Sequence, residues 1–172
     1  AALFKQDRDK LGDILIAPVA AAAEKNRTKT DYNKLGIVQA QFGRIKEAED
    51  SFGKAVRIDP KYASALANLG NVSFLRSDYS KAIESYRAAL SIIGPRGTSA
   101  NSASLSMLSN IVKAYSAMGK AELAKSYVDQ AIKLDPVQGN RIMASMADGS
   151  GLARAADAGA SMRTVDYLDE GY

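Results

Sequence analysis

The chain contains no cysteine and no histidine among its 172 residues, and these two absences remove much of catalytic chemistry. Without cysteine there is no disulfide framework, no thiolate nucleophile and no Cys-ligated metal. Without histidine the chain lacks the commonest general base and the commonest ligand of transition metals, so a Ser-His-Asp triad is impossible. We therefore predict that the chain is not an enzyme and has no catalytic residue, metal site or cofactor.

Motifs for nucleotides, membranes and nucleic acids are also missing. Gly119-Lys120 lacks the upstream glycine and the following Ser or Thr of a phosphate-binding loop. No apolar run reaches the roughly 18 residues of a membrane span, so we expect no membrane insertion. The net charge is only +4, aromatic residues are few, and the Lys and Arg residues are not clustered. This composition argues against a nucleic-acid partner.

What the sequence does contain is a self-similar unit of 34 residues. Leu35-Gly36, Ala48, Phe52 and Ala55 recur as Leu69-Gly70, Ala82, Tyr86 and Ala89. Each unit consists of two helical patterns joined by a short turn. Asp59-Pro60 ends the second helix of the first unit, because the residue before a proline is disfavoured in a helix. A unit of this kind cannot bury its apolar face alone and must stack on neighbouring copies.

The repeats divide the chain into three parts. The predicted boundaries are 1–28 for an N-terminal capping segment, 29–62, 63–96 and 105–138 for three units with an insert at 97–104, and 139–172 for a C-terminal capping helix with an acidic tail. Pro18 kinks the N-terminal helix or starts a second segment. The insert forms a longer loop or an extra turn that opens the next helix. In the third unit Ile111-Val112 replaces Leu-Gly, and Val128 replaces the aromatic residue.

The order Leu-Gly, Ala, Phe or Tyr, Ala and Pro resembles the tetratricopeptide repeat family over about residues 29–138. The resemblance implies an all-α, right-handed α-solenoid of antiparallel helix pairs with capping helices at both ends. It also implies a concave groove, lined by the first helix of each pair, that holds a peptide or helix of a partner. The expected function is a non-catalytic scaffold for protein–protein interaction.

Transferred to this chain, the resemblance places mostly small and neutral side chains in the groove. The candidate partner-binding residues are Asn33, Ile37, Gln41, Asn68, Asn71, Phe74, Leu75, Asn110 and Lys113. The asparagine amides can donate to and accept from the main chain of an extended peptide. For Phe74 and Leu75 the alternative is a place in the core between repeats, and for Asn68 and Asn110 it is a packing role.

The resemblance also bears on the identity of the partner. Chaperone-binding members of the family grip a terminal carboxylate with Lys, Arg and Asn. In this chain Asn68 matches one of these positions, but Asn33 and Ile37 stand where a Lys and an Asn are required, and Ser106 and Asn110 where a Lys and an Arg are required. We therefore do not expect a chaperone tail as the ligand.

Two other functions are compatible with the same residues. The end helices carry Phe4, Leu11, Met143 and Met146, which can pair between copies to form a homo-oligomer. The acidic tail, with Tyr167 and Tyr172, is a further candidate for packing along the mildly basic repeats of its own chain or of a neighbouring copy. Alternatively, the chain is an accessory docking module of a larger multidomain protein.

Overall fold

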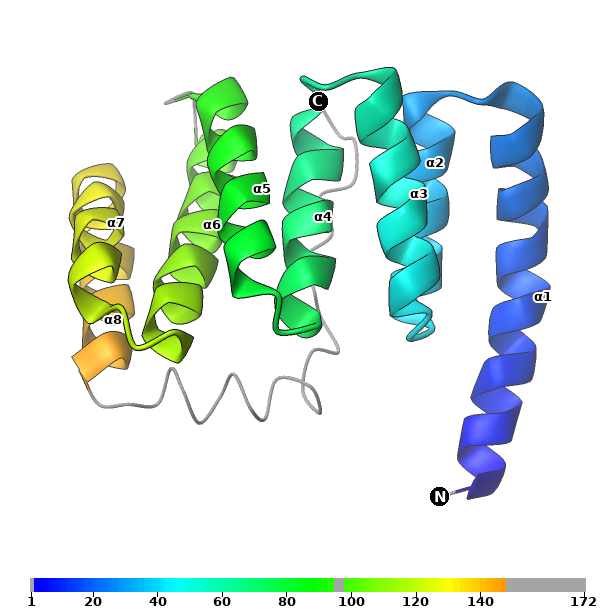
Figure 1. Ribbon diagram of the computed structural model, residues 1–172, viewed down its shortest axis with the longest axis horizontal. Coiled ribbons are helices and arrows are strands. Elements are labelled where there is room, and N and C mark those ends of the chain that lie inside the picture. Colours follow the sequence, from blue (N-terminus) through cyan, green and yellow to red (C-terminus); the bar gives the residue numbers. More distant parts are fainter. Residues whose placement is uncertain (1, 95–97, 148–172) are drawn as a thin grey trace.

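The computed structural model describes residues 2–94 and 98–147, which fold into helices and short turns (Figure 1). The helices are α1 (Ala2–Asn26), α2 (Lys29–Gln41), α3 (Ile45–Ile58), α4 (Ala63–Leu75), α5 (Tyr79–Ile93), α6 (Thr98–Ala117), α7 (Ala121–Leu134) and α8 (Pro136–Ala147). Figure 1 shows them side by side, with α1 at one end of the molecule and α7 and α8 at the other. The predicted all-α solenoid is confirmed.

The solenoid is built from pairs of helices that are adjacent in the sequence. α2 packs against α3, α4 against α5 and α6 against α7, and the second helix of each pair packs against the first helix of the next. First helices also contact one another, α2 with α4 and α4 with α6, whereas second helices make no comparable contact with one another in the described ranges. The first helices are therefore closer together, and the face that they form is the concave one.

The two end helices continue this alternation. α1 packs against α2 as α3 packs against α4, and α8 packs against α7 and also contacts α6. α1 thus occupies the position of a second helix, and α8 occupies that of a first helix. Pro18 lies inside α1, which runs unbroken from Ala2 to Asn26, so the alternative that Pro18 starts a second segment is wrong.

The insert before the third unit extends a helix. α6 begins at Thr98 and has 20 residues, compared with 13 in α2 and 13 in α4. Of the two alternatives for residues 97–104, the extra turn at the start of the helix is therefore the one observed from residue 98 onward.

The turns inside the pairs share a left-handed residue at one position of the repeat. Gly43, Ser77 and Gly119 have φ values of 77°, 61° and 69°. Glycine adopts this conformation without steric cost, whereas a side chain such as that of Ser77 is disfavoured there. The backbone turn is thus conserved between the pairs even where the residue type is not.

Close packing within the first two pairs requires the glycine of each Leu-Gly. A Cβ atom at Gly36 would lie 2.5 Å from the ring of the facing phenylalanine, and one at Gly70 would lie 2.7 Å from the ring of Tyr86. The third pair holds Val112 and Val128 at these two positions, and both are buried in one cluster. The larger side chain on one helix is therefore matched by a smaller one on the other.

Candidate partner-binding face

The nine predicted partner-binding residues all lie on the first helices, whose face is concave, but the structure divides them by burial. Gln41 is exposed, Ile37, Leu75, Asn110 and Lys113 are half-buried, and Asn33, Asn68, Asn71 and Phe74 are buried. The burial of the second group follows from contacts between successive pairs.

Two of the buried asparagines bond to each other. The Nδ2 atom of Asn68 on α4 donates to Oδ1 of Asn33 on α2 at 3.1 Å. Asn68 is fully buried and Asn33 is 1% exposed. Because the bond joins the first helices of successive pairs, these asparagines hold the repeats together and present no surface to a partner. Asn33 Nδ2 and Asn68 Oδ1 have no hydrogen-bond partner within the described ranges.

A second network passes through the buried hydroxyl group of Tyr86 on α5. The hydroxyl group donates to Oδ1 of Asn71 on α4 at 2.8 Å and accepts from Nδ2 of Asn110 on α6 at 3.2 Å. One side chain thus links the second and third pairs. The sequence placed both asparagines on first helices, but it identified Tyr86 only as a repeated aromatic position, and the bridging role of its hydroxyl group was missed.

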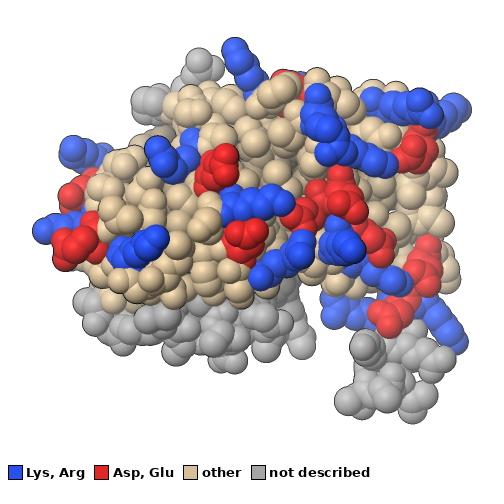
Figure 2. Space-filling model, viewed as in Figure 1, with Lys and Arg blue, Asp and Glu red and all other residues tan. Residues whose placement is uncertain are grey.

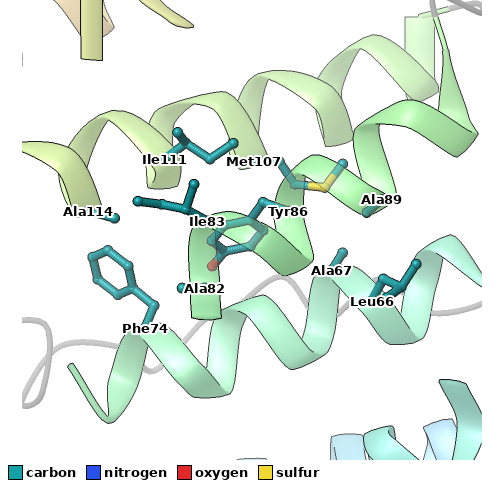
Figure 3. Packing of buried hydrophobic residues seen from close by; sticks show 10 residues of the cluster. All are labelled: Leu66, Ala67, Phe74, Ala82, Ile83, Tyr86, Ala89, Met107, Ile111 and Ala114. Atoms are coloured by element: carbon teal, nitrogen blue, oxygen red, sulfur yellow. The ribbon is translucent and has the colours of Figure 1, made fainter. Parts of the chain in front are cut away.

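Phe74 belongs to the core between the second and third pairs. It is 6% exposed and packs in a cluster with Ile83, Met107 and Ile111. Figure 3 shows this cluster, with Tyr86 of α5 between residues of α4 and of α6. The ring of Phe74 also meets that of Tyr79 edge to face, with centroids 5.3 Å apart. Of its two predicted roles, the structure shows the packing role.

The concave face therefore offers a smaller set of accessible side chains. Ile37 and Leu75 are apolar, Gln41 and Asn110 carry amides, and Lys113 carries a positive charge. Positions that are equivalent in successive repeats form rows along the face. Such rows of amide and apolar groups are suited to an extended segment, which presents its main chain and alternate side chains at regular intervals.

The opposite face, formed by the second helices, has a cluster of charges where the first and second pairs meet. Glu49 on α3 forms ion pairs with Arg76, just after α4, and with Lys81 on α5. The Glu49 side chain is only 15% exposed. The hydrogen bond from Lys81, with a smaller contribution from Arg76, lowers the pKa of this carboxyl group despite its partial burial.

α1 is attached to the first pair by ion pairs near its middle and near its C-terminal end. The Arg44 guanidinium pairs with Asp13 at 2.7 Å, and Lys54 Nζ pairs with Glu24 at 2.8 Å. The hydrogen bond from Lys54 lowers the pKa of Glu24. Arg8 adds a bond from its Nη2 atom to the carbonyl oxygen of Gln41 at 2.9 Å. The N-terminal helix is therefore a specific part of the solenoid.

Other kinds of site find no support in the described ranges. No group of three or more acidic residues that could hold a metal ion occurs there. No helix described in the structure is both long and apolar enough to cross a bilayer. Figure 2 shows Lys and Arg residues interspersed with Asp and Glu over the face in view, and not gathered into a patch of one sign.

Comparison with known proteins identifies the repeats. Patterns described as tetratricopeptide repeat match residues 33–98 and residues 105–138. Tetratricopeptide repeat protein 36 of Bos taurus is 29% identical over 111 positions, which cover 58% of this chain and 58% of that protein. Two crystal structures of MamA are similar in fold, with TM-scores of 0.64 and 0.67 at 21% and 20% identity. The alignments cover 76% and 88% of this chain and 67% and 87% of those chains.

Proposed function

Because the chain belongs to the tetratricopeptide repeat family, we propose that it is a non-catalytic scaffold that binds a peptide or helix of a partner protein on its concave face. The observation that carries the proposal is the direct contact of α2 with α4 and of α4 with α6, which makes one continuous surface from three repeats. A segment lying along this surface contacts equivalent positions of successive pairs.

The accessible residues indicate what kind of segment the face binds. Gln41, Leu75 and Ala117 are equivalent positions on α2, α4 and α6. The side chain of Gln41 is exposed, and those of Leu75 and Ala117 are half-buried. Ile37, Asn71 and Lys113 form the neighbouring row of equivalent positions, in which Asn71 is buried and the other two are half-buried. The combination of amide and apolar positions favours a largely neutral segment with apolar side chains.

The test begins with affinity capture of partners by the wild-type chain, followed by titration of the purified partner. In the variant Gln41→Arg with Leu75→Glu, charges replace the neutral row, and we expect the affinity to fall by roughly tenfold or more. Ile58→Glu is the matched control, because Ile58 is 48% exposed and lies on the second helix α3. Equal affinity of the concave-face variant and the wild type would show that the concave face is not the binding site.

A second candidate function, self-assembly, is favoured by the exposed apolar residues of the end helices. On α1, Leu11, Ile14 and Leu15 are 50%, 69% and 45% exposed, and their spacing places them on one face. On α8, Val137 and Met143 are 63% and 45% exposed. Because α1 is a second helix without a first helix, and α8 a first helix without a second, α8 of one copy packed on α1 of the next would complete a pair.

Met146, Phe4 and the acidic tail were also predicted to contribute to self-assembly. Met146 is half-buried and packs against the core of the third pair. The side chain of Phe4 and the tail with Tyr167 and Tyr172 lie outside the described residues.

A head-to-tail contact of this kind is open and can be blocked at either end separately. We expect Ile14→Asp and Val137→Asp each to reduce the mass of the assembly in analytical ultracentrifugation. A mixture of the two variants should form dimers, because each retains the end that the other has lost. A wild-type chain that sediments as a monomer at all concentrations would contradict self-assembly and leave the concave face untouched.

A further inference from the structure

A pocket of about 510 Å³ lies on the face of the second helices, where the second and third pairs meet. α5, the end of α6, the turn after it and the start of α7 line the pocket, with Ile83, Glu84, Arg87, Tyr115, Met118 and Leu123 among the lining residues. The volume is within the range of about 300–1,000 Å³ that is typical of ligand-binding sites. None of these residues belongs to the accessible set on the concave face.

The repeat register explains why a pocket exists at this junction. Ile83 follows Glu49 by one repeat of 34 residues, and Met118 and Leu123 follow Arg76 and Lys81 by the repeat plus the eight inserted residues. At the first junction these three positions hold the ion pairs of Glu49 with Arg76 and Lys81. At the second junction the same positions hold three apolar side chains, which line the pocket instead of pairing across it.

The charges around this apolar lining are unequal. Arg87 and Lys120 are exposed and form no ion pair with a carboxylate in the described part of the chain, and Glu84 is the one acidic residue of the lining. The pocket therefore has an apolar interior and a net positive edge. A carboxylate attached close to an apolar side chain complements both features.

We propose that this pocket is a second binding site, which takes an aromatic or aliphatic side chain adjacent to a carboxylate on a segment of a partner protein. Tyr115 supplies an aromatic surface in the pocket, and its ring lies 5.6 Å from that of Tyr127. This contact between the rings restricts side-chain rotation of Tyr115, so Tyr115 forms a rigid part of the pocket lining. Because α5 and α7 are second helices, the solenoid can hold this segment and a concave-face ligand at the same time.

The test uses methyl NMR of the full chain, because the methyl groups of Ile83, Met118 and Leu123 report on the pocket and those of Ile37 and Leu75 report on the concave face. The probes are the peptides Asp-Tyr-Leu-Asp-Glu, its amide counterpart Asn-Tyr-Leu-Asn-Gln, and Asp-Ser-Ser-Asp-Glu, which lacks apolar side chains. We expect the first peptide to shift the pocket methyl groups in a saturable way, and the other two to bind roughly tenfold more weakly or not at all.

Two variants and a control test which pocket residues contribute to the affinity for the first peptide. Leu123→Lys introduces the residue of the first junction, and Lys120→Glu reverses a charge at the edge. Each should weaken binding of the first peptide by about tenfold, because one removes apolar surface and the other opposes the carboxylate. Lys125→Glu is the control, since Lys125 is exposed on the same helix but does not line the pocket. Its affinity should change by less than about twofold.

Three results would overturn the proposal. Shifts confined to the methyl groups of Ile37 and Leu75 would assign the peptide to the concave face. No saturable shift at any of the five reporters would exclude the pocket site without testing the concave face. Pocket shifts in the full chain on changing Tyr167 and Leu168 to Ser, without added peptide, would identify the acidic tail of this chain as the occupant in place of a partner.

Discussion

The two junctions between the three helix pairs are similar in backbone and opposite in chemistry. At the first, Glu49 pairs with two cations and closes the outer surface. At the second, Ile83 stands in the place of Glu49, and the surface opens into a pocket. Helix pairs can therefore stack in the same way with different residues at the seam, because the buried core and not the outer seam carries the stacking. The residues on the outer surface of a junction can therefore change without loss of stacking, and they can form a binding site.

The largest expected effect tests what the first two pairs share and the third does not. Gly70→Ala should lower the free energy of unfolding by about 2–3 kcal/mol, because its Cβ would lie 2.7 Å from the ring of buried Tyr86. Gly53→Ala is the control: its nearest neighbour would be Arg57 Nη1 at 3.5 Å, and helix propensity should add about 0.5–1 kcal/mol. Urea unfolding measures both, and equal midpoints would refute close packing at Gly70.

A smaller loss is expected at the polar bridge across the second junction. Tyr86→Phe removes the hydroxyl group and leaves Asn71 Oδ1 and Asn110 Nδ2 without it, at a cost of about 1–2 kcal/mol. Tyr79→Phe should change stability by less than about 0.5 kcal/mol, because the Phe74 ring contact remains. Chemical denaturation of the two variants compares them directly. Similar losses at both positions would contradict a specific role of the Tyr86 hydroxyl group.

The charged seam of the first junction should depend on pH and salt. Glu49→Gln should cost about 1 kcal/mol at pH 7, and less at high salt, because both cationic partners are partly exposed. The lowered pKa of Glu49 means that its contribution is complete above its ordinary value of 4.5 and is lost as the pH falls through its folded-state value. Stability measured against pH should thus fall less steeply below 4.5 in the variant than in the wild type. Parallel curves would exclude Glu49 as a contributor.

The smallest effect concerns the shared turns. Ser77→Gly should raise the midpoint of thermal unfolding and add about 0.5 kcal/mol, because Ser77 has a φ of 61° where Gly43 and Gly119 occupy equivalent turns. The reciprocal change, Gly43→Ser, should lower stability by about 1 kcal/mol. A loss in the first variant would mean that the Ser77 side chain makes a contribution greater than its backbone strain.

Much of the architecture was predictable because it depends on local and periodic features. The 34-residue period predicted the helix pairs, and the Asp-Pro sequences predicted where their second helices end. In the structure α3 ends at Ile58 and α7 ends at Leu134. Asp135 also accepts from the backbone N–H groups of Val137 and Gln138, which stabilises the start of α8. These effects act within a few residues and need no knowledge of the stacking.

The candidate site was less predictable because burial depends on neighbouring repeats. The pattern placed Asn33, Asn68 and Asn71 on first helices, but it could not fix how far each helix is rotated toward the next. In the structure these three asparagines are buried and hydrogen-bonded to side chains of other helices, whereas Gln41 remains exposed. The half-buried Leu75 is still a candidate for partner contact and awaits the concave-face test.

The sequence by itself determined that the chain is a stack of helix pairs, since a periodic apolar pattern leaves each pair with a face that only another pair can cover. It also contained the exchange of Glu49 for Ile83. Only the tertiary structure decided that α1 and α8 take the places of half-pairs, that Tyr86 bridges three helices, and that the second seam is a pocket. Each of these depends on side chains from separate helices meeting in space, and their meeting is set by the stacking angle and not by local propensity.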